Sequence, residues 1–332
     1  MIAQPPRFCN NARLAASVVV LAVLLNGCAS LLFPQTAALR DAPPAGLPER
    51  VELKEVPFFP QEDYQCGPAA LATVLSHFKV KVTPDDLVGQ VYLPERKGSL
   101  QIEILAAARR HGMVSYQLAP RFDDLLREVA AGNPVILLQN LGMGPFERWH
   151  YAVAIGYDLG ESELVLRSGV KQRQVLPFAL HEYVWKRSDY WAMVALPPER
   201  IPASADESRW LAAVAALERV GNTRAARTAY AASVKRWPES VNAAIGLANT
   251  HYASRELKQA ESVLRALVAS RPDSVVALNN LAQTLSDQGQ NEEALKLIER
   301  AAAAGGPFAS TVSETRELIL KRIAGRTPPD RR

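Results

Sequence analysis

The most constraining feature of this chain is a recurrence in its second half. Pro238, Pro272 and Pro307 follow one another at intervals of 34 and 35 residues. A repeat of this length is one supersecondary unit that cannot bury its apolar face alone, so the period predicts a stack of helical hairpins. The apolar and small positions that recur are Trp210, Leu217, Ala226 and Tyr230 in the first unit, Leu247, Ala248, Ala260 and Leu264 in the second, and Leu281, Ala282, Ala294 and Ile298 in the third.

This pattern resembles the tetratricopeptide repeat. The units are expected at about 207–238, 241–272 and 275–307, inside a region 199–325 that is followed by a short tail, 326–332. The resemblance implies a concave groove for a peptide or a partner protein, although repeats can also serve only to cap a preceding domain.

The preceding segment, 51–198, mixes helical and strand patterns. Its helices are expected first, after Cys66, from Thr83 and Pro84, from Ser99 to about Arg110, and up to Gly132. Helices followed by hairpin-linked strands predict an α+β domain with a mainly antiparallel sheet. The expected strands are 134–140, 150–158, 163–169, 173–177 and 190–197, with a short helix before the last.

The N-terminal segment has the layout of an export signal. Arg7 and Arg13 precede an apolar run from Leu14 to Leu25, which is short for a membrane span. The following "LLNGC" resembles the lipobox of bacterial lipoproteins, although an uncleaved anchor or plain secretion would share this layout. The resemblance implies that a signal peptide, 1–27, is removed, that Cys28 is lipidated, and that 28–50 form a tether.

The expected cellular location and the charge of the mature chain follow from this interpretation. Ala29 occupies the position where an aspartate favours inner-membrane retention in similar lipoproteins, so the expected location is the periplasmic face of the outer membrane. The chain has 332 residues and a formal charge of +4, which falls to +2 without Arg7 and Arg13. So small a charge gives no reason to expect nucleic acid as a partner.

Cysteine usage singles out one thiol. The chain has three cysteines, and Cys9 leaves with the signal while Cys28 would carry lipid, so Cys66 would be the only free thiol of the mature chain. Gly67 permits a close approach, and Pro68 suits the first position of a helix. At a helix start, the dipole and free N–H groups would lower the thiol pKa and could hold an oxyanion. The alternative is a buried cysteine that acts as a small hydrophobe.

A catalytic thiol also needs a base, and His150 is the preferred candidate. It follows the loop "LGMGPFERW" and opens the strand "HYAVAIGYD", where one side chain at the end of a sheet can point into a cleft. The other four histidines have ordinary helix or repeat positions: His77, His111, His181 and His251.

The two blocks "Q…CGPAAL" and "WHYAVAIGYD" resemble the bacteriocin-processing, double-glycine-leader type of papain-like cysteine peptidase over about residues 51–197. The resemblance implies a papain-like fold with Cys66 as nucleophile, His150 as base and Gln61 as oxyanion donor. Gln65 is a weaker competitor for the last role, and the spacing from Gln61 to Cys66 is one residue shorter than the family's usual spacing.

The expected third catalytic residue departs from the family pattern. The family has Asp on the strand after the histidine strand, where this chain reads "LVLRSG" and places Ser168. Asp158 cannot replace it, because a strand rising ~3.3 Å per residue puts Asp158 roughly 26 Å from His150. The hydroxyl of Ser168 is expected to accept a hydrogen bond from Nδ1–H of His150, more weakly than a carboxylate would.

The sequence therefore predicts a lipid-anchored cysteine peptidase that cleaves a peptide or protein through a thioester, with repeats that recruit a protein. The alternatives are a catalytically weak or inactive peptide-binding adaptor, and a thiol transpeptidase or amidase. No cofactor or metal is expected, because the sequence contains neither "HExxH" nor a Cys/His pair at ligand spacing. The chain shows no exporter signature such as "GxxxxGK[ST]", so a bacteriocin leader is not the expected substrate.

Overall fold

A computed structural model describes residues 32–60, 65–143 and 145–325. The predicted signal peptide, Cys28, Gln61 and the tail 326–332 lie outside the described residues. The chain forms two compact units that divide near residue 196, apart from two short segments: 108–115 groups with the second unit and 202–204 with the first. Among the described helices, none combines the length and the hydropathy that crossing a bilayer requires.

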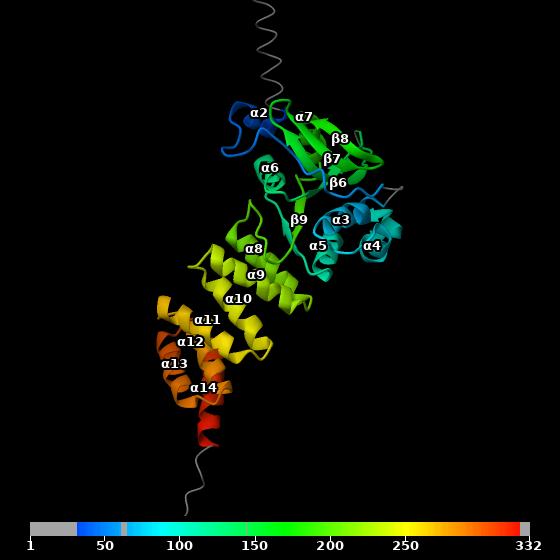
Figure 1. Cartoon of the computed structure of the whole chain (residues 1–332). Coiled ribbons are helices and arrows are strands. Elements are labelled where there is room, and N and C mark those ends of the chain that lie inside the picture. Colours follow the sequence, from blue (N-terminus) through cyan, green and yellow to red (C-terminus); the bar gives the residue numbers. More distant parts are fainter. Residues whose placement is uncertain (1–31, 61–64, 144, 326–332) are drawn as a thin grey trace, which may run out of the picture. The chain divides into compact units, whose positions relative to one another are not determined.

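The first unit is built on a seven-stranded sheet with the order β4-β9-β5-β6-β7-β8, in which β1 also pairs with β6 (Figure 1). The registered pairs of this sheet are antiparallel. The strands are β1 (Arg50–Glu52), β4 (Val114–Gln117), β5 (Val135–Asn140), β6 (Trp149–Asp158), β7 (Glu163–Ser168), β8 (Lys171–Pro177) and β9 (Ala192–Leu196). The five strands predicted from the sequence are therefore confirmed, and β1 and β4 are the two strands of this sheet that were not among them.

The helices of this unit are α2 (Pro34–Asp41), α3 (Cys66–His77), α4 (Pro84–Val91), α5 (Gln101–Arg110), α6 (Phe122–Ala130) and α7 (Phe178–Lys186), with short strands β2 (Tyr92–Leu93) and β3 (Gly98–Ser99) between α4 and α5. α3, α4 and α5 lie together in Figure 1. Thr83 and Asp86 form the capping box that starts α4. The α+β class with an antiparallel sheet is confirmed.

Two details differ from the sequence-based expectation. α2 lies inside the predicted tether, 28–50, where no helix was expected. α3 begins at Cys66, so Pro68 is its third residue and not its first; a proline is tolerated there because the first four N–H groups of a helix have no intrahelical acceptor. The helix is buried all round from Gly67 to Leu75.

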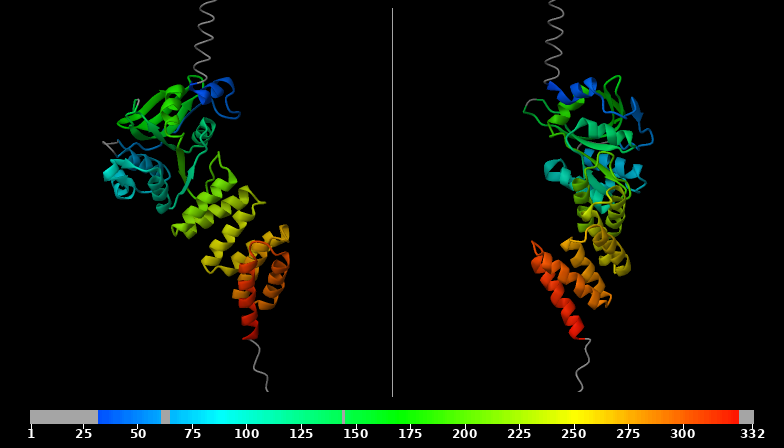
Figure 2. Two further views of the ribbon diagram at one scale, coloured as in Figure 1. Left: turned by 180° about the vertical axis from the view of Figure 1, so that it is seen from behind. Right: turned by 90° about the vertical axis from the view of Figure 1, so that its left-hand side faces the viewer.

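The second unit is a run of antiparallel helices, as the repeat pattern predicted (Figure 2). The predicted knob and small positions are buried, among them Trp210, Ala260 and Ile298. Asp206, Ser240 and Ser274, spaced 34 residues apart, each cap the helix that follows. The helices are α8 (Glu207–Arg219), α9 (Thr223–Arg236), α10 (Val241–Ala253), α11 (Leu257–Ser270), α12 (Val275–Asp287), α13 (Asn291–Ala304) and α14 (Ala309–Ala324).

The turn inside each helical hairpin requires a left-handed residue. Gly221 and Gly289 supply it with φ of 89° and 83°, but the equivalent position of the middle repeat is Arg255, with φ of 62°. A left-handed conformation costs a residue with a Cβ roughly 1–2 kcal/mol, and glycine is nearly free of this cost.

Arg255→Gly should therefore raise the free energy of unfolding by about 1 kcal/mol. Denaturant melts of the full chain, followed by circular dichroism, would measure it. Ser254→Gly is the matched control, because Ser254 has φ of −84° and gains nothing from glycine. An equal effect of the two substitutions would contradict the argument.

Candidate active site

Cys66 is the first residue of α3, directly after the N-cap residue Gln65. Gly67 brings this helix start close to β3, because a Cβ at residue 67 would lie 2.2 Å from the Ser99 hydroxyl oxygen and 2.5 Å from its Cβ. Any larger side chain at residue 67 would push the helix away from Ser99. Ser99 is therefore the residue whose close approach requires a glycine next to Cys66.

Burial and nearby backbone N–H groups act in opposite directions on the Cys66 thiol. Burial raises the pKa of the Cys66 thiol above its ordinary value, and this effect outweighs the backbone N–H groups of Tyr151, Gly67 and Cys66, which favour the thiolate. The predicted direction of this pKa shift was therefore wrong. A helix start lowers a thiol pKa only where the dipole and the N–H donors stabilise the thiolate by more than burial destabilises it. The contact with Tyr151 also brings the sulfur to the residue that follows His150.

His150 lies at the start of β6 and contacts Ser168 at the end of β7. Nε2 of His150 is 2.9 Å from the Ser168 hydroxyl oxygen, so the predicted pairing is present, but through Nε2 and not through Nδ1. If Nε2–H donates to the hydroxyl, Nδ1 keeps its lone pair and can accept a proton. The antiparallel return of β7 along β6 produces this proximity.

Burial sets the charge state of the site. Desolvation, with repulsion from Arg148, lowers the pKa of His150 to about 4, so its imidazole is neutral at pH 7. The thiol is neutral there as well, since its pKa is raised. The resting site therefore holds an uncharged thiol at the start of α3 and an uncharged imidazole at the start of β6, and the described contacts of His150 include no carboxylate that would offset the cost of charging it.

The remaining predicted residues fall elsewhere. Gln61 and Cys28 lie outside the described residues. Asp158 is at the opposite end of β6, where its carboxylate pairs with Arg50 and accepts the N–H of Glu161, as the distance argument predicted. Within residues 32–60, 65–143 and 145–325, no group of three His, Cys, Asp or Glu side chains is placed to hold a metal ion.

Sequence reasoning missed the groups that arrange this site through the backbone. Tyr151 offers its N–H to the sulfur, and its hydroxyl donates to the Ser99 carbonyl at 3.1 Å. Asn140 is buried, and its side-chain oxygen accepts from the N–H groups of Gly142 and Arg148, which closes the loop before β6. A polar residue at the end of an apolar strand was the sequence signal that could have pointed to Asn140. No sequence signal pointed to the backbone of Tyr151.

Comparisons with known proteins agree with this architecture. Residues 53–190 match the Peptidase C39 like family, and residues 211–275 match the tetratricopeptide repeat. A search of curated proteins found no match.

Two solved structures resemble part of the chain. One, described as a C39-like peptidase from Bacillus anthracis, is 19% identical over 45% of this chain and 98% of its own, with a TM-score of 0.38. The other, a double-glycine-motif protease from an AMS/PCAT transporter in complex with the leader peptide, is 20% identical over 42% of this chain and 90% of its own, with a TM-score of 0.33. From the family matches, we conclude that the chain has a peptidase C39-like domain followed by tetratricopeptide repeats.

Proposed function

We propose that this chain is a cysteine peptidase of the bacterial envelope, anchored by lipid on Cys28, whose repeats recruit a protein substrate or partner. The observation that carries the catalytic part is the packing of α3, which begins at Cys66, against β6, which carries His150 near its start. The family match over residues 53–190 supports the same assignment. The outer membrane, periplasmic face, is the proposed location.

The proposed reaction begins with two neutral groups. Nδ1 of His150 takes the Cys66 proton as the sulfur attacks the substrate carbonyl, and the same proton then passes to the leaving amine. Water hydrolyses the resulting thioester and restores the thiol. The backbone N–H of Cys66 and the side-chain amide of Gln61 would hold the negative oxygen of each tetrahedral intermediate.

A second candidate function is a weak or inactive peptidase that binds peptide as an adaptor. The raised pKa of Cys66, the lowered pKa of His150 and the serine at position 168 favour it. The two candidate functions differ in one respect. A peptidase requires that a bound substrate, by excluding water and pairing charges, allows this uncharged site to catalyse cleavage, and an adaptor does not.

Cys66→Ala should abolish cleavage of envelope peptides and labelling by a thiol-directed electrophile, with the circular dichroism spectrum unchanged. Comparison of envelope peptides from cells with and without the substitution would identify the substrates. His150→Ala should abolish cleavage as well, and His111→Ala, which changes a histidine just after the C-terminus of α5, is the matched control. Normal cleavage by the Cys66→Ala variant would overturn the proposed activity. A wild-type chain that is labelled at Cys66 but cleaves no peptide would support the adaptor.

Ser168→Asp should raise the pKa of His150, because a carboxylate within ~4–6 Å favours the imidazolium by about 1–3 pKa units. The imidazolium in turn favours the thiolate, so alkylation of Cys66 at pH 7 should accelerate by roughly tenfold or more. The wild-type rate should instead keep rising into the alkaline range. Iodoacetamide alkylation measured from pH 5 to 10 tests both statements.

Ser162→Asp is the control for that experiment. It adds the same charge directly before β7, about 20 Å from Ser168 for a strand that rises ~3.3 Å per residue. Equal pH profiles for Ser168→Asp and Ser162→Asp would show that residue 168 does not act on the base.

Gln61→Ala should lower kcat by about 10²–10³-fold with little change in KM, the effect expected for loss of one oxyanion donor. Gln65→Ala should have the smaller effect. Steady-state kinetics on a substrate identified by the peptide comparison would measure both, and the reverse order would transfer the proposed role to Gln65.

A further inference from the structure

Helix α2, which follows the proposed lipid site in the chain, is held firmly on the peptidase-like domain. The carboxylate of Glu182 on α7 is fully buried and accepts the first free N–H groups of α2, from Gln35 at 3.0 Å and Thr36 at 2.7 Å. A carboxylate at this end of a helix also matches the positive end of its dipole. Glu182 therefore fixes the N-terminus of α2 on α7.

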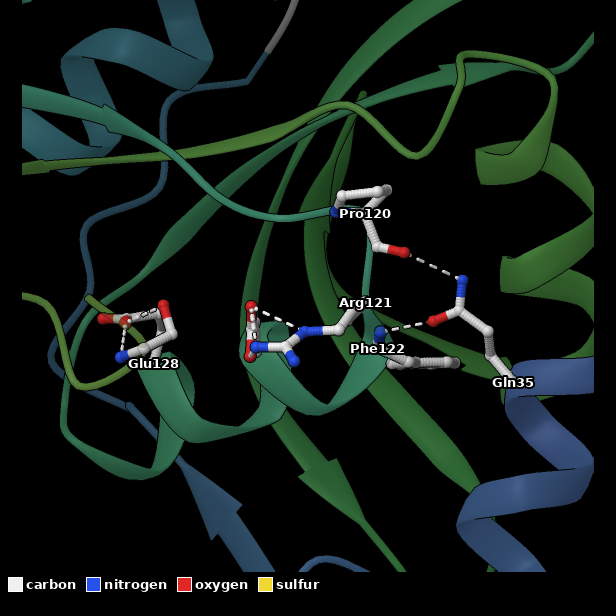
Figure 3. Close-up of polar contacts among 7 residues, drawn as sticks. Gln35, Pro120, Arg121, Phe122 and Glu128 are labelled. Carbon is white, nitrogen blue, oxygen red and sulfur yellow. Dashed lines mark hydrogen bonds and ion pairs between the residues drawn. The ribbon is translucent and has the colours of Figure 1, made fainter. Parts of the chain in front are cut away.

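The side chain of Gln35 adds a second attachment (Figure 3). Its amide nitrogen donates to the Pro120 carbonyl at 3.2 Å, and its oxygen accepts the N–H of Phe122 at the start of α6. The chain from Gln35 onward is thus part of the folded domain and not a free tether.

The chain between Cys28 and this attachment is short. Gln35 lies seven residues after Cys28, and an extended chain spans at most ~3.6 Å per residue, or about 25 Å in total. A domain of about 150 residues has a radius of gyration of ~15 Å and is roughly 40 Å across. A lipid on Cys28 therefore cannot reach around to the opposite face of the domain.

The outer face of α7 has the composition of a membrane-facing surface. Leu180 and Tyr183 are 47% and 50% exposed, and Leu32, just before α2, is 62% exposed. Lys186 is exposed on the same face, and Arg187 lies over the Tyr183 ring at 6.0 Å. Glu182, the acidic residue of α7, is buried.

We propose that this surface of α7, made by Leu180, Tyr183 and Lys186, lies on the phospholipid headgroups and fixes the orientation of the domain on the membrane. Apolar and tyrosine side chains with a basic rim suit the interfacial region, where the bodies of the side chains are buried and their polar ends stay in water. Basic residues are also attracted to anionic lipids. The inference rests on the proposed lipidation of Cys28, which brings the surface within reach.

The test uses the full chain, purified from envelopes in its lipidated form, with Cys66→Ser to remove the competing thiol. A bimane probe on Leu180→Cys reports contact with vesicles of phosphatidylethanolamine and phosphatidylglycerol that contain phospholipids with a nitroxide near the headgroup. We expect loss of most of the fluorescence at position 180. Tyr183→Cys offers a second probe position if the first variant folds poorly.

Val170→Cys is the matched control. Val170 is 78% exposed, more than Leu180, and precedes β8, whose seven residues span about 23 Å at ~3.3 Å each before α7 begins. A domain without a fixed orientation would show at least as much quenching at position 170 as at position 180. Equal quenching in a chain that floats with vesicles would overturn the orientation alone.

Mass spectrometry of the N-terminal peptide and vesicle flotation separate the two levels of the proposal. A chain without acyl groups on Cys28 that does not float would overturn the anchor and the orientation together. Flotation with selective quenching at position 180 would support both the anchor and the orientation. Flotation without quenching at position 180 would overturn the contact of α7 with lipid and would indicate that this surface binds a protein.

Discussion

The contact between α3 and the start of β6 is the constraint on which the candidate site depends. α3 packs against β6, so the strand that carries His150 is held against the helix that carries the thiol, and the backbone N–H of Tyr151 favours the thiolate. β6 is fixed in turn by three partners, β1, β5 and β7. Because β7 returns antiparallel to β6, it also delivers Ser168 to the imidazole. One central strand therefore aligns every described member of the site.

Burial then decides what this arrangement can do. It raises the pKa of the thiol and lowers that of His150 to about 4, so each group is neutral when the site is empty. A carboxylate at position 168 would oppose both shifts, whereas a hydroxyl orients the ring without a charge. The peptidase and adaptor proposals therefore differ by one physical quantity, the free energy of forming the thiolate and the imidazolium together.

Much of the fold could be predicted from the sequence, because local patterns determine it. The 34-residue period located the helical hairpins, and alternation located five strands of the sheet. The pairing of His150 with Ser168 followed from hairpin geometry, which depends on chain distance alone. The direction of the Cys66 pKa shift could not be predicted, because burial of a side chain is set by residues distant in sequence. Neither could the use of Nε2, which depends on the ring orientation in the packed site.

Helix α2 was missed for a related reason. Its eight residues include one large apolar side chain, Leu39, and show little periodicity. Its position is fixed by Glu182 and by the loop before α6, over a hundred and about eighty-five residues away in the chain. An isolated helix this short is not stable in water. The buried carboxylate therefore converts the second part of a predicted tether into a rigid attachment. If lipid is present on Cys28, the free length that remains is shorter than the domain is wide, and orientation follows from chain length as much as from surface chemistry.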